Sequence, residues 1–156
     1  MKKLYVFGMA IIIALAFASC GSEKEYGDAY KKPCYEESKS DPHFFREIGY
    51  GIHSDLDKSS EMAIDEAYTK MEKRLEREYR KVIDTVSIVS SNKDEEREYR
   101  ENALREVIQG ALRTADNACY DYYKNKKENK WYYFYVIEIQ KFNVDELIQK
   151  ELNKKQ

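Results

Sequence analysis

Two histidines and two aspartates flank one short stretch of the sequence, and these residue types can serve a metal site or acid–base catalysis. His43 and His53 bracket the stretch HFFREIGYGIH, and Asp55 and Asp57 follow it. A structural zinc site takes about four ligands, yet neither a third histidine nor a neighbouring nucleophile accompanies this pair. Turn and N-cap chemistry explains the two aspartates more simply than paired-carboxylate hydrolysis does. We therefore expect no catalytic residue, no metal and no cofactor.

The cysteines offer more specific chemistry. Cys20 ends a run in which a basic start precedes an almost wholly apolar stretch over residues 4–18, the layout of a secretory signal. This run is shorter than the roughly 20 apolar residues that a transmembrane helix needs. If Cys20 is used for anchoring, Cys34 and Cys119 remain as a pair in an oxidising compartment, which favours a disulfide over free thiols. Two thiols without nearby histidines do not make a zinc site.

The end of the apolar run resembles the signal of bacterial lipoproteins. Small residues precede Cys20, although Phe17 stands where that signal prefers leucine. The resemblance implies that residues 1–19 are removed and that Cys20 carries acyl chains such as palmitate, whereas an ordinary cleaved signal beside an unmodified cysteine is the alternative. Glu23 and Glu25 resemble export signals of some outer-membrane lipoproteins, and a solvated tether is their other explanation. We expect a lipid-anchored outer-membrane protein that faces the periplasm or the cell surface.

Composition bounds the remaining chain. Residues 20–41 are polar and read as a tether, and residues 42–156 have the size of one domain. The 27 basic and 29 acidic side chains of the whole sequence are interspersed. Because a nucleic-acid binder gathers basic residues into a patch, we expect no nucleic-acid partner.

Hydrophobic periodicity predicts the elements of this domain. Alternation over residues 43–52, broken by glycines, predicts an edge strand. A period of four over residues 59–86 predicts a long helix with Asp57 or Ser59 at its N-cap, with small residues that let it lie close to a sheet, and with exposed Glu-to-Lys or Glu-to-Arg pairs four residues apart. A second stripe over residues 99–115 predicts another helix.

The period then changes from four to two. Aromatic runs over residues 117–125 and 131–141 predict a hairpin in which residues 120–123 face residues 131–136. A short helix over residues 143–152 follows, with Asn143 as its cap and Glu146 reaching back. The expected fold is α+β: a small, mostly antiparallel sheet of an N-terminal strand and a C-terminal hairpin, packed by two long helices on one face.

Several short motifs of this chain form one pattern, made of Phe45, Arg46, Gly49, Gly51, Ser54, Asp55, Ala63, Ala67, Tyr132, Tyr135, Val136, Ile137 and Glu138. Together they resemble the small Gram-negative outer-membrane lipoproteins of the twenty-kilodalton type, whose domain is related to the N-terminal domain of a flagellar assembly protein. Ser59 and Met71 stand where that family keeps small residues. The resemblance implies an α+β lipoprotein domain without known catalysis.

The hairpin is the surface on which we expect the function. It carries more rings than one buried face requires, so we expect exposed rings and a ligand contact formed by Tyr122, Trp131, Tyr133 and Tyr135. Exposed Tyr and Trp suit protein contacts, here with an envelope protein, and they also suit stacking on saccharide or peptidoglycan. Cross-strand pairing that only stabilises the sheet is a third explanation. The first hypothesis is a non-enzymatic interaction domain for envelope organisation, and the oligomeric state stays open.

Overall fold

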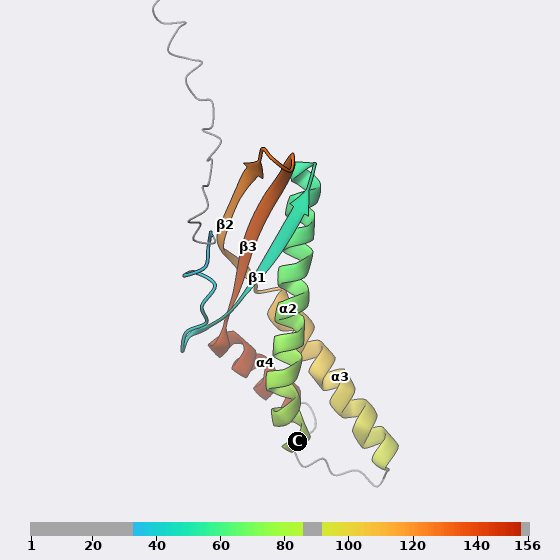
Figure 1. Ribbon diagram of the computed structural model, residues 1–156. Helices are drawn as coiled ribbons and strands as arrows, with labels where there is room; N and C mark the ends of the chain where they lie inside the picture. The colour runs from blue at the N-terminus through green and yellow to red at the C-terminus, as the bar shows by residue number, and fades with distance from the viewer. Residues whose placement is uncertain (1–32, 86–91, 154–156) are drawn as a thin grey trace, which may run out of the picture.

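The computed structural model describes residues 33–85 and 92–153 (Figure 1). The predicted signal peptide, Cys20, Glu23 and Glu25 lie outside the described residues. The α+β order of strand, two helices, hairpin and helix is confirmed. The elements are β1 (Phe44–His53), α2 (Leu56–Thr85), α3 (Lys93–Leu112), β2 (Asp116–Asn125), β3 (Lys130–Gln140) and α4 (Lys141–Asn153).

The sheet has three antiparallel strands in the order β1-β3-β2. The predicted hairpin is confirmed, since Tyr120 pairs with Tyr135 and Tyr123 pairs with Tyr132. A β-bulge interrupts the register between Asn117 and Cys119. The aromatic and β-branched runs therefore form a regular ladder from Cys119 to the turn.

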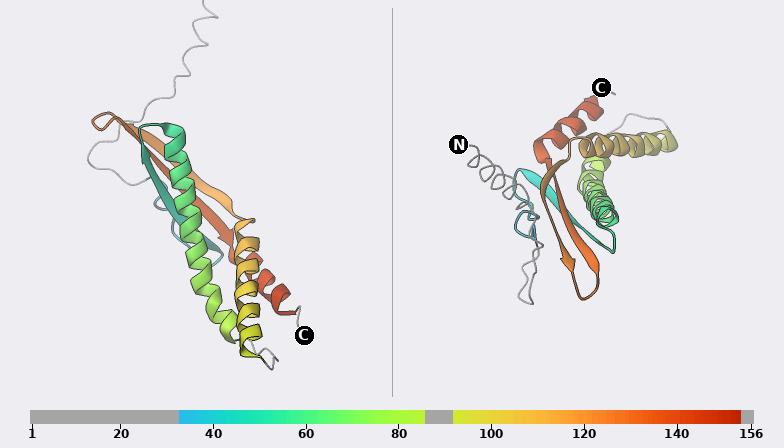
Figure 2. Two further views of the ribbon diagram at one scale, coloured as in Figure 1. Left: turned by 90° about the vertical axis from the view of Figure 1, so that its right-hand side faces the viewer. Right: turned by 90° about the horizontal axis from the view of Figure 1, so that it is seen from above.

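Helix α2 runs along one face of the sheet, lying over β1 and β3 (Figures 1 and 2). Gly49 and Gly51 of β1 face this helix. A Cβ atom built on Gly49 would overlap the Ala63 carbonyl oxygen, and one built on Gly51 would overlap the Ser59 carbonyl oxygen. Ala63 is itself fully buried. The glycines that appeared to break the strand are thus the positions where helix backbone and strand backbone meet.

The start of α2 differs from the prediction. The helix begins at Leu56, and the Lys58 N–H donates to Asp55 Oδ1 at 3.1 Å, so Asp55 is the N-cap rather than Asp57 or Ser59. Ser59 is fully buried, and its Oγ lies 2.8 Å from the Gly51 carbonyl oxygen and 3.1 Å from the Trp131 carbonyl oxygen. Its hydroxyl is used to join the helix to two strands, which explains why it does not cap.

The second half of α2 extends beyond the sheet and packs against α3, which in turn packs against α4 (Figure 2). Here the apolar stripes of three helices form one core, so α2 is the helix that covers the sheet and α3 packs mainly on other helices. The end of β3 leads directly into α4, whose first residue, Lys141, donates its N–H to the His43 carbonyl oxygen at 2.9 Å. Asn143 therefore lies inside the helix and the predicted capping box at Asn143 and Glu146 is wrong. Buried core residues beyond the sheet include Leu75, Tyr79, Ile83, Leu104, Val107, Ala111, Val144 and Ile148.

Side chains cover the outer backbone edge of β1. The Tyr50 N–H donates to Glu66 Oε2 at 2.6 Å, and Lys70 Nζ donates to the Ile48 carbonyl oxygen at 2.9 Å. The Arg46 N–H donates to Ser40 Oγ at 2.9 Å. Such contacts satisfy an edge that would otherwise accept a foreign strand. No helix among residues 33–85 and 92–153 is both long enough and apolar enough to cross a bilayer.

The Glu66 contact predicts an acid-dependent loss of stability. Burial raises the pKa of Glu66, but hydrogen bonds from Lys70 and from the Tyr50 N–H outweigh it and hold the pKa below its usual 4.5. Because the folded-state pKa is lowered, the stabilisation is present above 4.5 and is lost as the pH falls through the folded-state pKa. We expect Glu66→Gln to reduce this loss, by at most about 1 kcal/mol because the side chain is 39% exposed.

Urea titrations of both proteins at several pH values would measure this effect. Glu61→Gln, at an exposed position of the same helix, controls for the removed charge. Parallel pH curves for the parent and Glu66→Gln would contradict the assignment.

Candidate interaction surface on the hairpin

The pairing register decides which rings share a face. Directly opposed residues of antiparallel strands lie on the same face. Gly49 pairs with Tyr135 and Gly51 pairs with Tyr133, so these two tyrosines lie on the α2 side of the sheet. Tyr122 pairs with Tyr133 and lies there too. The structure therefore brings the four predicted contact residues, Tyr122, Trp131, Tyr133 and Tyr135, to one face.

Four of the rings on this face form what we call the aromatic ladder: Tyr120, Tyr122, Trp131 and Tyr133. The Tyr122 and Tyr133 rings are stacked with centroids 5.7 Å apart and planes 4° apart, and Tyr120 stacks on Tyr133 at 6.3 Å. Trp131 meets Tyr122 edge-on at 6.0 Å. The two β2 rings are the exposed ones, at 59% for Tyr120 and 41% for Tyr122, whereas the two β3 rings are half-buried.

The orientation of the ladder limits what it can bind. Adjacent strands lie about 4.8 Å apart, and the nearly parallel Tyr122 and Tyr133 rings pack on each other, so each ring covers part of the other. A saccharide stacks on an exposed ring face. Tyr120 and Tyr122 stand on β2, the outer strand of the sheet, and they are the more exposed rings of the ladder. This geometry favours a partner that approaches the β2 edge.

The opposite face of the sheet holds a second group of aromatic residues, which the predicted ligand contact did not include. Tyr123 stacks on Tyr132 at 5.0 Å, and Tyr50 meets Phe134 edge-on at 5.5 Å. The alternation of β1 could have indicated this second group. Residues next to the two glycines must point away from α2, and Tyr50 is one of them. An open apolar cavity of about 270 Å³ lies among these rings. Its lining residues are Tyr50, Gly51, Ile52, Tyr123, Tyr132, Tyr133 and Phe134.

The predicted disulfide is present and ties the segment before β1 to β2. Cys34 and Cys119 are bonded with their Cα atoms 5.8 Å apart, and Cys34 is buried. Cys119 pairs with Val136 and therefore lies on the face away from α2. The polar segment that leads to the domain is thus fixed to the hairpin strand that carries Tyr120 and Tyr122.

Arg46 and Glu138, two residues of the family pattern, meet across the sheet. Arg46 Nε donates to Glu138 Oε2 at 2.8 Å, and Arg46 Nη1 donates to Asp41 Oδ2 at 3.0 Å. Asp41 also accepts hydrogen bonds from the N–H groups of His43 and Phe44, and the first of these is the main reason that its pKa is lowered. These charges join the N-terminal segment to the sheet and are satisfied by one another.

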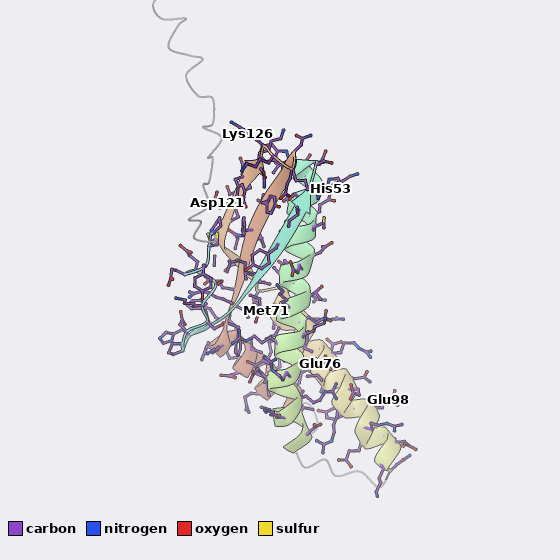
Figure 3. The ribbon with its side chains drawn as sticks, viewed as in Figure 1. His53, Met71, Glu76, Glu98, Asp121 and Lys126 are labelled. Carbon is purple, nitrogen blue, oxygen red and sulfur yellow. A yellow bond between two sulfur atoms is a disulfide. The ribbon has the colours of Figure 1, made fainter. Side chains whose placement is uncertain are left out.

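The structure separates the residues considered for metal binding or catalysis. His43 directly precedes β1 and His53 ends it beside the turn that carries Lys126 (Figure 3), so the two histidines lie at opposite ends of the strand. His53 Nδ1 accepts a hydrogen bond from the Asp55 N–H at 3.0 Å. Within residues 33–85 and 92–153, no group of three His, Cys, Asp or Glu side chains could hold a metal ion.

A comparison with protein-family models finds no match for this chain. A comparison with curated proteins also finds no significant match. The resemblance to the twenty-kilodalton lipoproteins stays a prediction.

Proposed function

We propose that the chain is a non-enzymatic, lipid-anchored outer-membrane protein whose domain presents the hairpin to another protein of the cell envelope. The observation that supports this best is the aromatic ladder, whose exposed rings at Tyr120 and Tyr122 stand on a sheet braced by α2. Tyr is enriched among the residues that anchor protein interfaces. The anchoring itself rests on the sequence up to Cys20.

Intact mass of the protein from native membranes tests the anchor. We expect the loss of residues 1–19 and an acyl-sized increment that disappears in Cys20→Ser. Reduction should add the mass of about two hydrogens for the Cys34–Cys119 bond. A product that keeps residues 1–19, or one that is processed but carries no acyl chain, would refute the lipoprotein half of the proposal.

Site-specific photo-crosslinking in native membranes tests the surface. A photoreactive phenylalanine analogue would replace Tyr122, and the same analogue would replace Phe142 of α4, an exposed aromatic residue at 66%, as the matched control. We expect discrete protein adducts at position 122 that are absent at position 142. Equal adduct patterns would show that the ladder is not a preferred contact.

Saccharide binding is the second candidate function, and the half-buried Trp131 next to Lys124 supports it. Lys124 Nζ lies 5.4 Å from the centre of the Trp131 ring, so a hydrogen-bond donor for saccharide hydroxyl groups lies beside a ring on which a sugar can stack. Trp131 is the single tryptophan of the chain, and its fluorescence therefore reports on this place alone. A saturable shift with peptidoglycan fragments that is lost in Tyr122→Ala would favour this function. Our first proposal predicts no saturable shift.

A further inference from the structure

The two edges of the sheet differ. On β1 the outward N–H and C=O groups belong to even-numbered residues such as Ile48 and Tyr50, and α2 side chains bind them. The odd-numbered residues of β1 therefore bond to β3, as in the Gly49–Tyr135 pair. It follows that β3 turns the backbone groups of its even-numbered residues, such as Phe134, toward β2.

The same alternation identifies the outward groups of β2. Asp121 is opposite Phe134, so its backbone groups point toward β3. Those of Tyr120, Tyr122 and Lys124 point away from the sheet. The Tyr122 N–H accordingly donates to the side chain of its neighbour, at 2.8 Å from Asp121 Oδ1. Among the described residues, β3 is the one strand that pairs with β2.

We propose that β2 pairs antiparallel with β2 of a second copy of this chain, with the two-fold axis at Tyr122, so that two sheets join into one of six strands. This inference names a second copy of the chain as the partner of the proposed surface. It rests on the proposed function only because both use the aromatic ladder of the hairpin. Edge-to-edge pairing satisfies the outward carbonyl groups of β2 and exchanges the Asp121 acceptor of the Tyr122 N–H for a backbone carbonyl of the second copy. It also brings the exposed tyrosine rings of the two strands together. Two-fold symmetry is the usual symmetry of such assemblies.

The side chains favour this register over its neighbours. With the axis at Tyr122, the two Tyr122 rings lie opposite each other and each Tyr120 lies opposite Lys124 of the second copy. An axis at Asp121 would set two carboxylates opposite each other, which is unfavourable. An axis at Tyr120 would bring the second copy's strand against the bulge that ends at Cys119. An axis at Tyr123 would leave Tyr120 without a ring or strand residue opposite it.

The position of α2 favours the approach of a second copy, and the length of the paired stretch limits the strength of the pairing. Helix α2 lies over β1 and β3 rather than over β2, so the edge is not covered from that side (Figure 2). A paired stretch of residues 120–124 is much smaller than a standard interface of about 1,600 Å². We therefore expect a weak dimer whose population depends on protein concentration.

Cysteine crosslinking of the full chain in detergent micelles and in native membranes tests the pairing. Directly opposed residues that exchange hydrogen bonds have Cα atoms about 5.5 Å apart, within disulfide range. Under mild oxidation, Tyr122→Cys should form a covalent dimer several-fold more abundantly than Phe142→Cys, the exposed aromatic control on α4. The parent protein gives the background crosslinking from its own cysteines. A Cys34–Cys119 bond that is retained in each variant verifies the fold of that variant.

A mixture of variants tests the register. Two copies of Tyr120→Cys would have their cysteines about four residues or 13 Å apart, and so would two copies of Lys124→Cys. Neither variant should crosslink alone, whereas a mixture of the two should give a heterodimer. Crosslinking of Tyr122→Cys at the level of the control overturns the dimer, and equal yields for single and mixed variants overturn the register. Photo-adducts at Tyr122 with a different protein, without this crosslink, would leave the proposed function standing and remove self-pairing.

Discussion

Replacing Gly49 by alanine should lower the free energy of unfolding by about 3 kcal/mol or more, the upper range for forcing an extra methyl group into packed space. The new Cβ would overlap the Ala63 carbonyl oxygen and would lie 2.5 Å from the Ala67 nitrogen. Both are helix backbone atoms, which cannot rotate away as a side chain does. The helix would have to lift from the sheet, which separates Ser59 from the strand carbonyls that it binds.

Urea denaturation followed by circular dichroism would measure this change. Gly110→Ala is the matched control, because its Cβ would meet flexible side-chain atoms of Leu147 at 3.1 Å and 3.2 Å. Alanine also favours the helix over glycine by about 1 kcal/mol, so we expect a net change within about 1 kcal/mol of zero. A loss for Gly49→Ala as small as that of the control would show that α2 is not held against β1 as closely as the structure has it.

This close contact also shows what a sequence can and cannot predict. The small residues spaced by four in α2 indicated a close approach to a sheet, and the glycines of β1 were visible, but they were read as a weakness of the strand. A hydrophobic period says that a face is buried and does not say against which partner. The meeting of Gly49 with Ala63 is a tertiary fact, and no local pattern contains it.

Local chemistry was most predictive where a single element decides the outcome. The aromatic runs fixed the hairpin and its register because cross-strand pairs lie within one local motif. Several residues near the start of α2 can cap a helix, and tertiary contacts decide which one does. The Ser59 hydroxyl binds carbonyl oxygens of β1 and β3, and Asp55 caps the helix. The apolar stripe of α3 was also predicted correctly as the buried face of a helix. The packing of that face on α2 and α4 depends on where the chain turns.

The sequence predicted three of the four rings of the aromatic ladder but neither Tyr120, its most exposed ring, nor the geometry of the ladder. The fourth predicted residue, Tyr135, is partly buried against the core. Tyr122, Trp131, Tyr133 and Tyr135 were named from their density, and the alternation of strands indeed places them on one face. That the rings stack on one another depends on both strands being present. Among the described residues, β1 has its outer edge bound by α2 side chains and β2 pairs with no second strand. This contrast depends on Glu66 and Lys70, whose spacing had indicated only a surface ion pair.

Removing the disulfide should lower the free energy of unfolding about as much as the Gly49 substitution does, and it should act mainly through the unfolded state. The Cys34–Cys119 bond closes a sequence separation of 85 residues, for which the chain-entropy model predicts about 4 to 5 kcal/mol. We expect the double variant, Cys34→Ser with Cys119→Ser, to lose about 2 to 5 kcal/mol in urea denaturation, the range found when native disulfides are removed. The parent protein under reducing conditions should show the same loss.

The slope of unfolding free energy against urea separates this mechanism from damage to the folded state. An unfolded chain released from a long loop exposes more surface, so the slope should rise in the double variant. Residues 39–41 keep other ties to the domain, since Asp41 and the Lys39 carbonyl oxygen both bind Arg46. The folded domain and its aromatic ladder should therefore persist, with the near-ultraviolet circular dichroism of the tyrosines largely retained. A loss below about 1 kcal/mol, well under the usual range for native disulfides, would mean that the unfolded chain is already held compact without the bond.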